Sequence, residues 1–276
     1  MTADAETRYI RQLDIFTAEG QRRIGAARIA VLGLGGLGSH VCQQLAYLGA
    51  KRFVLVDDDL VDETNLNRLV GATGSDVGIA KNVIMERLIK SVQPTAEVDS
   101  IVAMLPHDHI DAAISSTDLI MGCFDNDYPR LMTTALASEH RVPYVDAASG
   151  INVGEASLDF GGRVVVAGIA KGCLNCMNML DQDEIRRAQM NDAELEQEAK
   201  LYGVSVESLR GTGPSVVAIN GVIASLAVVE AMHILSRIKI RRDPVITYRG
   251  VPGWITRKDP PTDECYYCSI WNDVTK

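Results

Sequence analysis

The stretch Arg28-Ile-Ala-Val-Leu-Gly-Leu-Gly-Gly-Leu-Gly-Ser39 decides the fold class of this chain. Its apolar first half ends at a cluster of glycines, a pattern typical of a buried parallel strand that leads into a tight turn. Residues 39–48 have helical spacing and precede Gly49, which predicts a helix with a glycine C-cap. Residues 53–57 predict a second strand. Together these segments predict a strand, helix, strand unit.

Strands and helices continue to alternate up to residue 150. Helices are expected over residues 81–91 and 132–140, and strands over residues 119–123 and 143–146. This alternation predicts an α/β, Rossmann-like fold with a largely parallel sheet. Beyond residue 150, β-like runs over 162–169 and 245–258 flank a long apolar helix from about residue 215. We expect antiparallel strands there to continue the sheet.

Composition and charge exclude several classes of protein. The chain has 276 residues, of which 47% are hydrophobic and 23% charged, so disorder of its bulk is excluded. Its 27 basic and 36 acidic residues give a net charge of −9, which argues against a nucleic-acid partner. The N-terminal segment lacks a signal-peptide pattern, so we expect a cytoplasmic location. Residues 215–235 include Asn220, Glu230 and His233, which favours a buried helix and no membrane.

The glycine cluster fits the pattern G-x-G-x-x-G, with glycines at positions 33, 35, 36 and 38. Its place between a strand and a helix is typical of a nucleotide site, because glycine lets the backbone approach phosphate oxygens and the helix N-terminus directs N–H groups at them. Asp57 follows Gly38 by 19 residues, where a carboxylate can accept hydrogen bonds from ribose hydroxyls. The sequence therefore predicts a bound nucleotide.

Charged side chains after the second predicted strand indicate which nucleotide binds. A P-loop NTPase is excluded because the sequence lacks G-x-x-x-x-G-K-[ST]. Arg68 and Lys81 suit a triphosphate better than a dinucleotide pyrophosphate. Asp125 follows a strand that ends at Cys123, where its carboxylate can hold Mg²⁺ on the phosphates. An NAD-dependent oxidoreductase and a non-catalytic nucleotide-binding scaffold remain as alternatives.

Four of the six cysteines form two C-x-x-C pairs. Cys173 with Cys176 and Cys265 with Cys268 can place four thiolates around Zn²⁺, a closed structural site that would tie the C-terminal tail to the body. A redox dithiol is the rival interpretation. The other two cysteines, Cys42 and Cys123, are expected to be buried and unreactive.

The ordered set of motifs resembles the MoeB/ThiF/HesA family, relatives of the ubiquitin-activating enzymes. The resemblance runs from Arg8 to Cys268 and rests on Arg8-Tyr-Ile-Arg11-Gln12, Gly33 to Gly38, Asp57-Asp-Asp59, Asn65-Leu-Asn-Arg68, Lys81, Asp125-Asn126 and the paired cysteines. It implies that ATP and Mg²⁺ are used to adenylate the C-terminal carboxylate of a ubiquitin-like or sulfur-carrier protein, or of a peptide, with release of pyrophosphate. It also implies a homodimer with structural zinc.

Residue roles follow from the same resemblance. The implied ATP-binding residues are Gly33, Gly35, Gly36, Gly38, Asp57, Asp59, Asn65, Arg68, Lys81, Asp125 and Asn126. The implied catalytic residues are Asp125, Arg68, Lys81 and Arg11, which would reach into the partner subunit's site. One ThiF-type domain over residues 1–276 is implied, with a helical arm (1–27), a nucleotide-binding half (28–150) and a substrate-binding and zinc-bearing half (151–276).

The chain departs from many relatives in the polar segment 181–214, which contains no cysteine. A catalytic cysteine in this segment would form a thioester or persulfide with the carrier. We therefore expect activation to stop at the acyl adenylate, without a catalytic-cysteine thioester. The part over residues 181–210 is expected to be an exposed helical excursion or a mobile loop.

Overall fold

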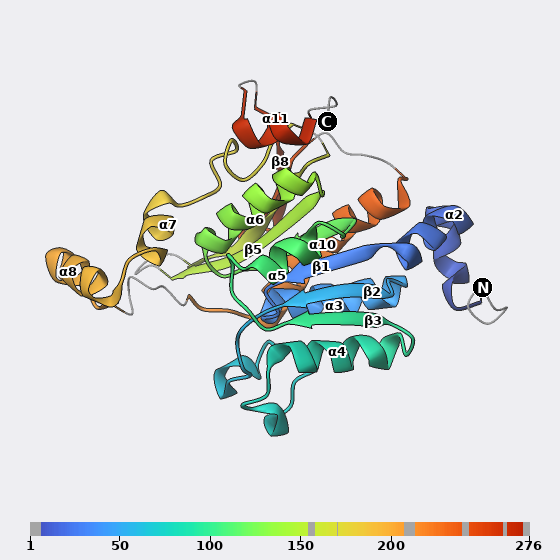
Figure 1. Ribbon diagram of the computed structural model, residues 1–276, viewed down its shortest axis with the longest axis horizontal. Coiled ribbons are helices and arrows are strands. Elements are labelled where there is room, and N and C mark those ends of the chain that lie inside the picture. The colour runs from blue at the N-terminus through green and yellow to red at the C-terminus, as the bar shows by residue number, and fades with distance from the viewer. Residues whose placement is uncertain are drawn as a thin grey trace.

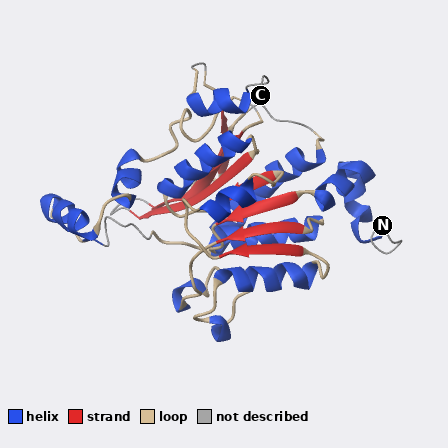
Figure 2. Ribbon diagram, viewed as in Figure 1, coloured by secondary structure: helices blue, strands red, loops and turns tan. Residues whose placement is uncertain are grey.

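One mixed sheet forms the centre of the fold (Figures 1 and 2). The computed structural model describes residues 7–153, 158–169, 171–206, 213–238, 243–261 and 264–272, and within these it has eight strands in the order β3-β2-β1-β4-β5-β6-β7-β8. The strands are β1 (Arg28–Leu32), β2 (Arg52–Val56), β3 (Glu97–Ile101), β4 (Leu119–Gly122), β5 (Tyr144–Val153), β6 (Leu158–Ala167), β7 (Val245–Arg249) and β8 (Trp254–Lys258).

The strand pairing changes from parallel to antiparallel at β5. Strands β3, β2, β1, β4 and β5 pair in parallel, with Ile29 opposite Phe53 and Leu119. Strands β5, β6, β7 and β8 pair antiparallel. The expected parallel sheet with an antiparallel continuation is therefore confirmed.

Helices cover both faces of the sheet. The first face carries α2 (Leu13–Ala26), α3 (Gly36–Leu48), α4 (Lys81–Val92) and α10 (Val217–Ser236), and the second carries α5 (Asp108–Ile114), α6 (Asp127–His140) and α11 (Tyr266–Asn272). A hydrophobic core lies on each face of the sheet, and alternate residues of β1 belong to the two cores. Ile29 and Val31 pack in the first core, on the first face, and Ala30 and Leu32 pack in the second core, on the second face. This alternation is the period-2 pattern of a strand buried on both sides.

Two short helices project from the body after β6. They are α7 (Gln182–Ala188) and α8 (Asp192–Tyr202), and α8 lies farthest from the sheet (Figure 1). Glu198 of α8 joins them, because its carboxylate accepts hydrogen bonds from Arg186 and Arg187 at 2.6–3.0 Å. The expected helical excursion is confirmed up to residue 206, and residues 207–210 lie outside the described part of the chain.

Helix α10 is the one described helix that is long and apolar enough to cross a membrane by length and composition. In the fold it packs on α2, α3, β5 and β6, and Ile223, Ala227 and Ala231 are buried in the first core. Val222 and Val229 on its other side are exposed. The predicted burial of this helix is therefore confirmed for one side only.

Candidate functional site

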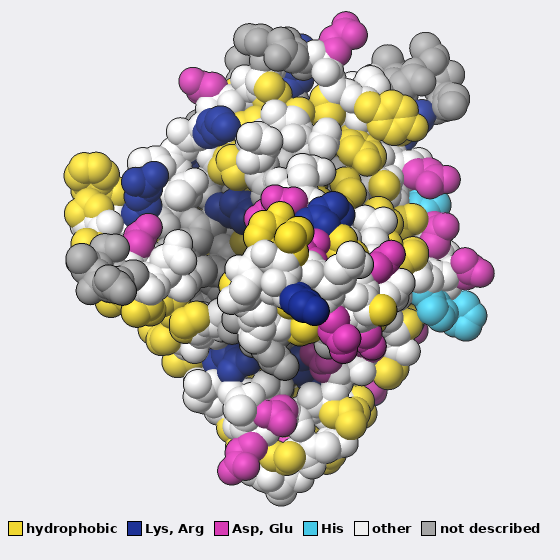
Figure 3. Space-filling model, turned by 90° about the vertical axis from the view of Figure 1, so that its left-hand side faces the viewer, with side chains coloured by type: hydrophobic (Ala, Val, Ile, Leu, Met, Phe, Trp, Pro, Cys, Tyr) yellow, Lys and Arg dark blue, Asp and Glu magenta, His cyan; other side chains and the backbone are white. Residues whose placement is uncertain are grey.

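A cleft of about 1640 Å³ opens where the parallel strands end. Its walls are the loop after β1, the segments after β2 and β4, strands β5 to β7, and α7. Figure 3 views the molecule from this end and shows basic and acidic side chains around a hollow. Ligands of open α/β sheets bind at this edge, which makes the cleft the candidate site.

The glycine loop brings β1 and α3 close together. Gly33 has φ +85°, and a Cβ there would lie 2.7 Å from the carbonyl oxygen of Cys123. A Cβ on Gly38 would lie 2.0 Å from the carbonyl oxygen of Gly33, so this position also requires glycine. Gly35 is the N-cap of α3, and a Cβ there would meet no atom within 4 Å. The N–H groups in the first turn of α3 have no intrahelical partner, and they border the cleft beside the open position of Gly35.

Asp57 and Lys81 lie beside this loop. The carboxylate of Asp57 accepts hydrogen bonds from the backbone N–H of Leu34 at 2.6 Å and of Asp59 at 2.9 Å. Burial raises the pKa of Asp57, although the Lys81 ammonium at 3.9 Å and the two backbone hydrogen bonds oppose the shift. Lys81 Nζ also lies 2.5 Å from Asp59 Oδ2. The ion pairs place an amine at the edge of the cleft near the glycine loop.

Asn65 and Arg68 line the same wall but contact their own loop. Asn65 Oδ1 accepts a hydrogen bond from the backbone N–H of Asp62 and closes a capping box of the short 3-10 helix Glu63–Asn65. The Arg68 guanidinium donates to the carbonyl of Thr64 at 2.6 Å. Its side-chain carbons lie 3.3 Å from where a Cβ on Gly36 would stand, so Arg68 packs directly against the glycine loop.

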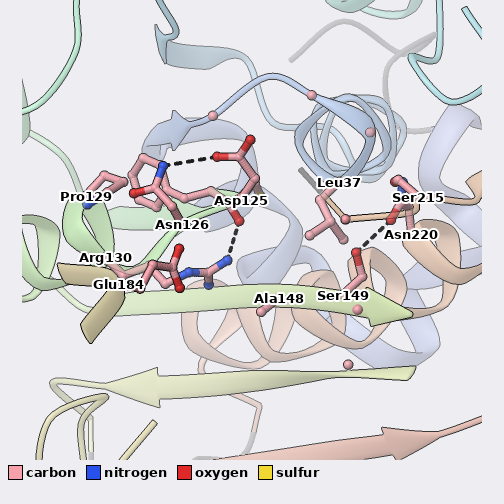
Figure 4. Close-up of a pocket in the computed structure, with 18 of the residues that line it drawn as sticks. Leu37, Asp125, Asn126, Pro129, Arg130, Ala148, Ser149, Glu184, Ser215 and Asn220 are labelled. Atoms are coloured by element: carbon pink, nitrogen blue, oxygen red, sulfur yellow. Dashed lines mark hydrogen bonds between the residues drawn. The ribbon is translucent and has the colours of Figure 1, made fainter. Parts of the chain in front are cut away.

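Asp125 and Asn126 lie between β4 and α6. Asn126 Nδ2 donates to Asp125 Oδ1 at 3.2 Å, and Asn126 is the N-cap residue of α6. Figure 4 shows these two residues on one side of the pocket, with Leu37, Ser215 and Asn220 on the other. The Asp125 carboxylate is exposed to the cleft, where it can take a cation.

The structure gathers all of the predicted ATP-binding residues at the cleft, with Gly38 packed just behind its lining. Arg11 lies elsewhere. It belongs to the 3-10 helix Ile10–Gln12, and the neighbouring Gln12 donates a hydrogen bond to the carbonyl of Leu48 at the end of α3. The glycine loop is at the other end of this 13-residue helix, a distance of about 20 Å. Arg11 is therefore remote from the cleft of its own chain.

Sequence reasoning missed several polar residues of the cleft. Ser149 donates to Asn220 at 2.7 Å, and Asn220 donates to Ser215 at 3.0 Å (Figure 4). Arg130 is buried beneath Asp125 and donates to Asp146 at 2.6 Å. Asp146 is the last residue of the strand predicted over residues 143–146. A polar residue at that position is expected near the carboxyl edge of the sheet, so the sequence could have indicated Asp146 as a site residue. Asn220 lies in an apolar helix and gave no comparable signal.

The two C-x-x-C pairs come together on the second face of the sheet, next to α11. The sulfur of Cys173 lies 3.7 Å from those of Cys176 and Cys265, and the sulfurs of Cys176 and Cys268 are 3.8 Å apart. A tetrahedron with Zn–S bonds of about 2.3 Å has sulfurs about 3.8 Å apart. The four cysteines therefore fit a zinc ion. Cys42 and Cys123 are buried as expected, and burial and Asp146 raise the pKa of Cys123 to about 12.

A Rossmann-like sheet with a glycine loop, a carboxylate and two cations at its carboxyl edge defines a nucleotide-binding α/β protein. The chain belongs to the ThiF family, whose sequence profile matches residues 8–265. The resemblance stated from the motifs is thereby confirmed.

Two relatives are named as an adenylyltransferase and an activating enzyme. The chain is 26% identical over 236 residues to the sulfur carrier protein ThiS adenylyltransferase of Escherichia coli, covering 84% of this chain and 82% of the relative. It is 30% identical over 143 residues to the SAMP-activating enzyme E1 of Haloferax volcanii, covering 51% of this chain and 53% of the relative. This second alignment thus spans about half of that relative's length.

Solved structures share the fold. The crystal structure of E. coli MccB with MccA-N7isoASN has a TM-score of 0.73 at 20% identity, and covers 95% of this chain and 74% of that chain. Adenylyltransferases are therefore the enzyme class to which this chain is related in sequence, while MccB shares its architecture.

Proposed function

We propose that this chain is an ATP-dependent adenylyltransferase. Its substrate is the C-terminal carboxylate of a ubiquitin-like or sulfur-carrier protein, or of a peptide, and pyrophosphate is the leaving group. One observation carries the proposal: Asp125, Arg68 and Lys81 converge with the N-terminus of α3 on a single cleft. The names of the relatives support this reaction over NAD-dependent oxidation and over a non-catalytic scaffold.

The chemistry requires little beyond positioning and charge. A substrate carboxylate is already ionised at pH 7, so no general base is needed. One of its oxygens attacks the α-phosphorus, and the bond from that phosphorus to the oxygen bridging to the β-phosphorus breaks. Negative charge then grows on the phosphate oxygens and on the departing pyrophosphate. The N–H groups of the glycine loop, Arg68 and Lys81 stabilise this charge.

The residues present fit ATP and a divalent cation. Asp57 uses one site on each carboxylate oxygen for backbone N–H groups, which leaves further acceptor sites for ribose hydroxyls. Asp125 offers exposed carboxylate oxygens, the ligand type that Mg²⁺ prefers. When bound there, Mg²⁺ supplies positive charge to the phosphates. Asp59, Asn65 and Asn126 complete the proposed binding set.

A homodimer completes the proposed site. Arg11 is about 20 Å from its own glycine loop, so it can serve catalysis only in a partner subunit. Ile10 and Ile15 on the same arm are 61% and 58% exposed, and Val222 and Val229 are exposed on α10. Apolar side chains of this kind are typical of surfaces that a second subunit covers.

The acyl adenylate is the proposed product in the absence of a nucleophilic thiol. Cys123 lines the cleft, but its pKa of about 12 keeps the thiol protonated at neutral pH. The four paired cysteines are proposed to hold structural zinc. A cytoplasmic location, without a nucleic-acid or membrane partner, belongs to the same proposal.

Exchange of labelled pyrophosphate into ATP tests this function. We expect exchange only when the chain is incubated with ATP, Mg²⁺ and a suitable carrier, and genes beside the coding sequence are the first source of candidate carriers. Binding of NAD in place of ATP would contradict the proposal in favour of an oxidoreductase. Binding of ATP without exchange for any neighbouring candidate would favour the scaffold.

A further inference from the structure

A buried arginine lies under the loop that carries Asp125. Arg130 is in the first turn of α6 and is 3% exposed. One terminal nitrogen donates to Asp146 Oδ2 at 2.6 Å and to the carbonyl of Ala147 at 3.3 Å, and the other donates to the carbonyl of Phe124. A single guanidinium thus joins the residue before Asp125 to strand β5.

Asp146 is itself fixed by its surroundings. Its side chain is 1% exposed, and Oδ1 accepts a hydrogen bond from the Tyr144 hydroxyl at 2.8 Å. Asp146 pairs in register with Gly122, where a Cβ would lie 2.5 Å from that hydroxyl. The carboxylate that receives Arg130 therefore has one available position.

The other side of Arg130 faces a second carboxylate. Asp127 Oδ1 lies 3.2 Å from Arg130 Nε and 3.8 Å from Arg163 Nη2. A buried cation between two carboxylates is costly to displace, because removing one partner leaves an uncompensated charge. The guanidinium is therefore a rigid anchor rather than a solvated surface group.

Asp125 has no such anchor of its own among the described residues. Its side chain is exposed, and the hydrogen bond it accepts comes from Asn126 of the same loop. The direction of its carboxylate is therefore set by the backbone, which Arg130 holds at Phe124.

We propose that Arg130 and Asp146 are positioning residues that aim the Asp125 carboxylate at the divalent cation bound with ATP. The inference rests on the proposed function, because that function gives Asp125 its cation. Arginine suits the task because its planar fork reaches a carbonyl and a carboxylate on two neighbouring segments at once, whereas lysine has one compact ammonium.

The affinity gained from a metal ion tests this role without turnover. The dissociation constant of ATP is measured by equilibrium dialysis with Mn²⁺ and with EDTA, for the wild type and for Arg130→Lys. We expect Mn²⁺ to tighten ATP binding to the wild type. In Arg130→Lys this gain falls by about tenfold or more, the usual cost of losing a residue that orients a metal ligand, while metal-free binding is unchanged.

Arg87→Lys is the matched control. Arg87 also bridges a buried aspartate and a backbone carbonyl, donating to Asp76 at 2.7–2.8 Å and to Gly71 at 3.0 Å, but it lies outside the cleft lining. We expect this variant to keep the wild-type gain from Mn²⁺. Asp146→Asn tests the same anchor from its other end and replaces Arg130→Lys if that chain fails to fold.

A double-mutant cycle with Asp125→Asn decides whether Arg130 acts through Asp125. If it does, adding Arg130→Lys to Asp125→Asn causes little further loss of the metal gain. Additive losses, or an unchanged gain in both Arg130→Lys and Asp146→Asn, would overturn the inference. The inference would also be overturned if the wild type bound ATP with the same dissociation constant in Mn²⁺ and in EDTA. Normal metal coupling without pyrophosphate exchange would instead count against the proposed function alone.

Discussion

Asp125 is the residue on which the proposed chemistry depends most. Replacement of Asp125 by alanine removes an exposed carboxylate that lines the cleft, and we expect pyrophosphate exchange to fall by more than ~100-fold, as for loss of one preorganised electrostatic contact. Asp108→Ala is a suitable control, since Asp108 is exposed in the first turn of α5 and lies outside the cleft lining. Equal exchange by the two variants would remove Asp125 from the mechanism.

The buried carboxyl group of Asp57 makes the stability of the folded protein depend on pH. Burial raises its pKa above the ordinary 3.8, so ionisation of Asp57 opposes folding. Its contribution to the free energy of unfolding is full below pH 3.8 and is lost as the pH rises through the higher pKa of the folded state. Asp57→Asn should therefore gain stability relative to the wild type as the pH rises above 3.8.

Urea unfolding of both proteins at several pH values measures this difference. The asparagine variant keeps one acceptor for the Leu34 N–H group but cannot ionise. A stability difference that does not change with pH would mean that Asp57 has an ordinary pKa in the folded protein.

At the level of single elements, we expect the paired cysteines to make the position of α11 depend on a bound metal ion. Elemental analysis of protein purified without added metal should find about one zinc per chain, as a four-thiolate site requires. Removal of the ion should loosen α11, because Cys268 lies in this helix and Cys265 just before it. Trp271 of α11 reports the change by fluorescence, since its indole donates to the carbonyl of Val142.

Cys268→Ser should show the fluorescence of the metal-free protein before any chelator is added. Tyr266→Ser, at an exposed position of the same helix, should keep both the zinc and the wild-type fluorescence. A folded, metal-free wild type with an unchanged Trp271 signal would refute the zinc site.

Most elements could be predicted from sequence because buried strands carry a continuous apolar signal. Strands β1, β2 and β4 and helix α4 lie where the patterns placed them. Helix α3 begins at Gly36 rather than residue 39. Glycine has a low helix propensity, and the glycines of the first turn are there because they let the helix lie close to the end of β1. Helix α6 begins at Asp127 rather than residue 132, because the buried Arg130 in its first turn interrupts the apolar periodicity that marks a helix in sequence. Strand β3 was missed because it is a polar edge strand.

The candidate site was less accessible to sequence reasoning than the fold. Residues of the glycine loop and the strand ends could be located, since the carboxyl edge of a parallel sheet gathers whatever follows each strand. Asn220 and Arg163 come from elements distant in sequence, and only the tertiary packing brings them to the cleft. The remote position of Arg11 likewise depends on how the arm packs at the end of α3.

For the whole molecule, the proposed role of Arg11 requires two chains for each working site. Chains with Arg11→Ala and chains with Asp125→Ala should each be inactive alone. In a mixed two-fold dimer, one site receives both intact residues and the other receives both lesions, so mixing should restore activity to a fraction of the wild type. Mass spectrometry of differently tagged chains confirms that subunits exchange. Lack of rescue after confirmed exchange would reject the trans role of Arg11.

The proposed reaction begins when a substrate carboxylate oxygen attacks the α-phosphorus of ATP. A carrier with ¹⁸O at both oxygens of its C-terminal carboxylate tests this step when it is incubated with the chain, ATP, Mg²⁺ and hydroxylamine as the acyl acceptor. Because attack joins the carboxylate oxygen to the α-phosphorus, we expect the released AMP to contain one ¹⁸O atom. AMP without the label, or ADP as the nucleotide product, would contradict the account.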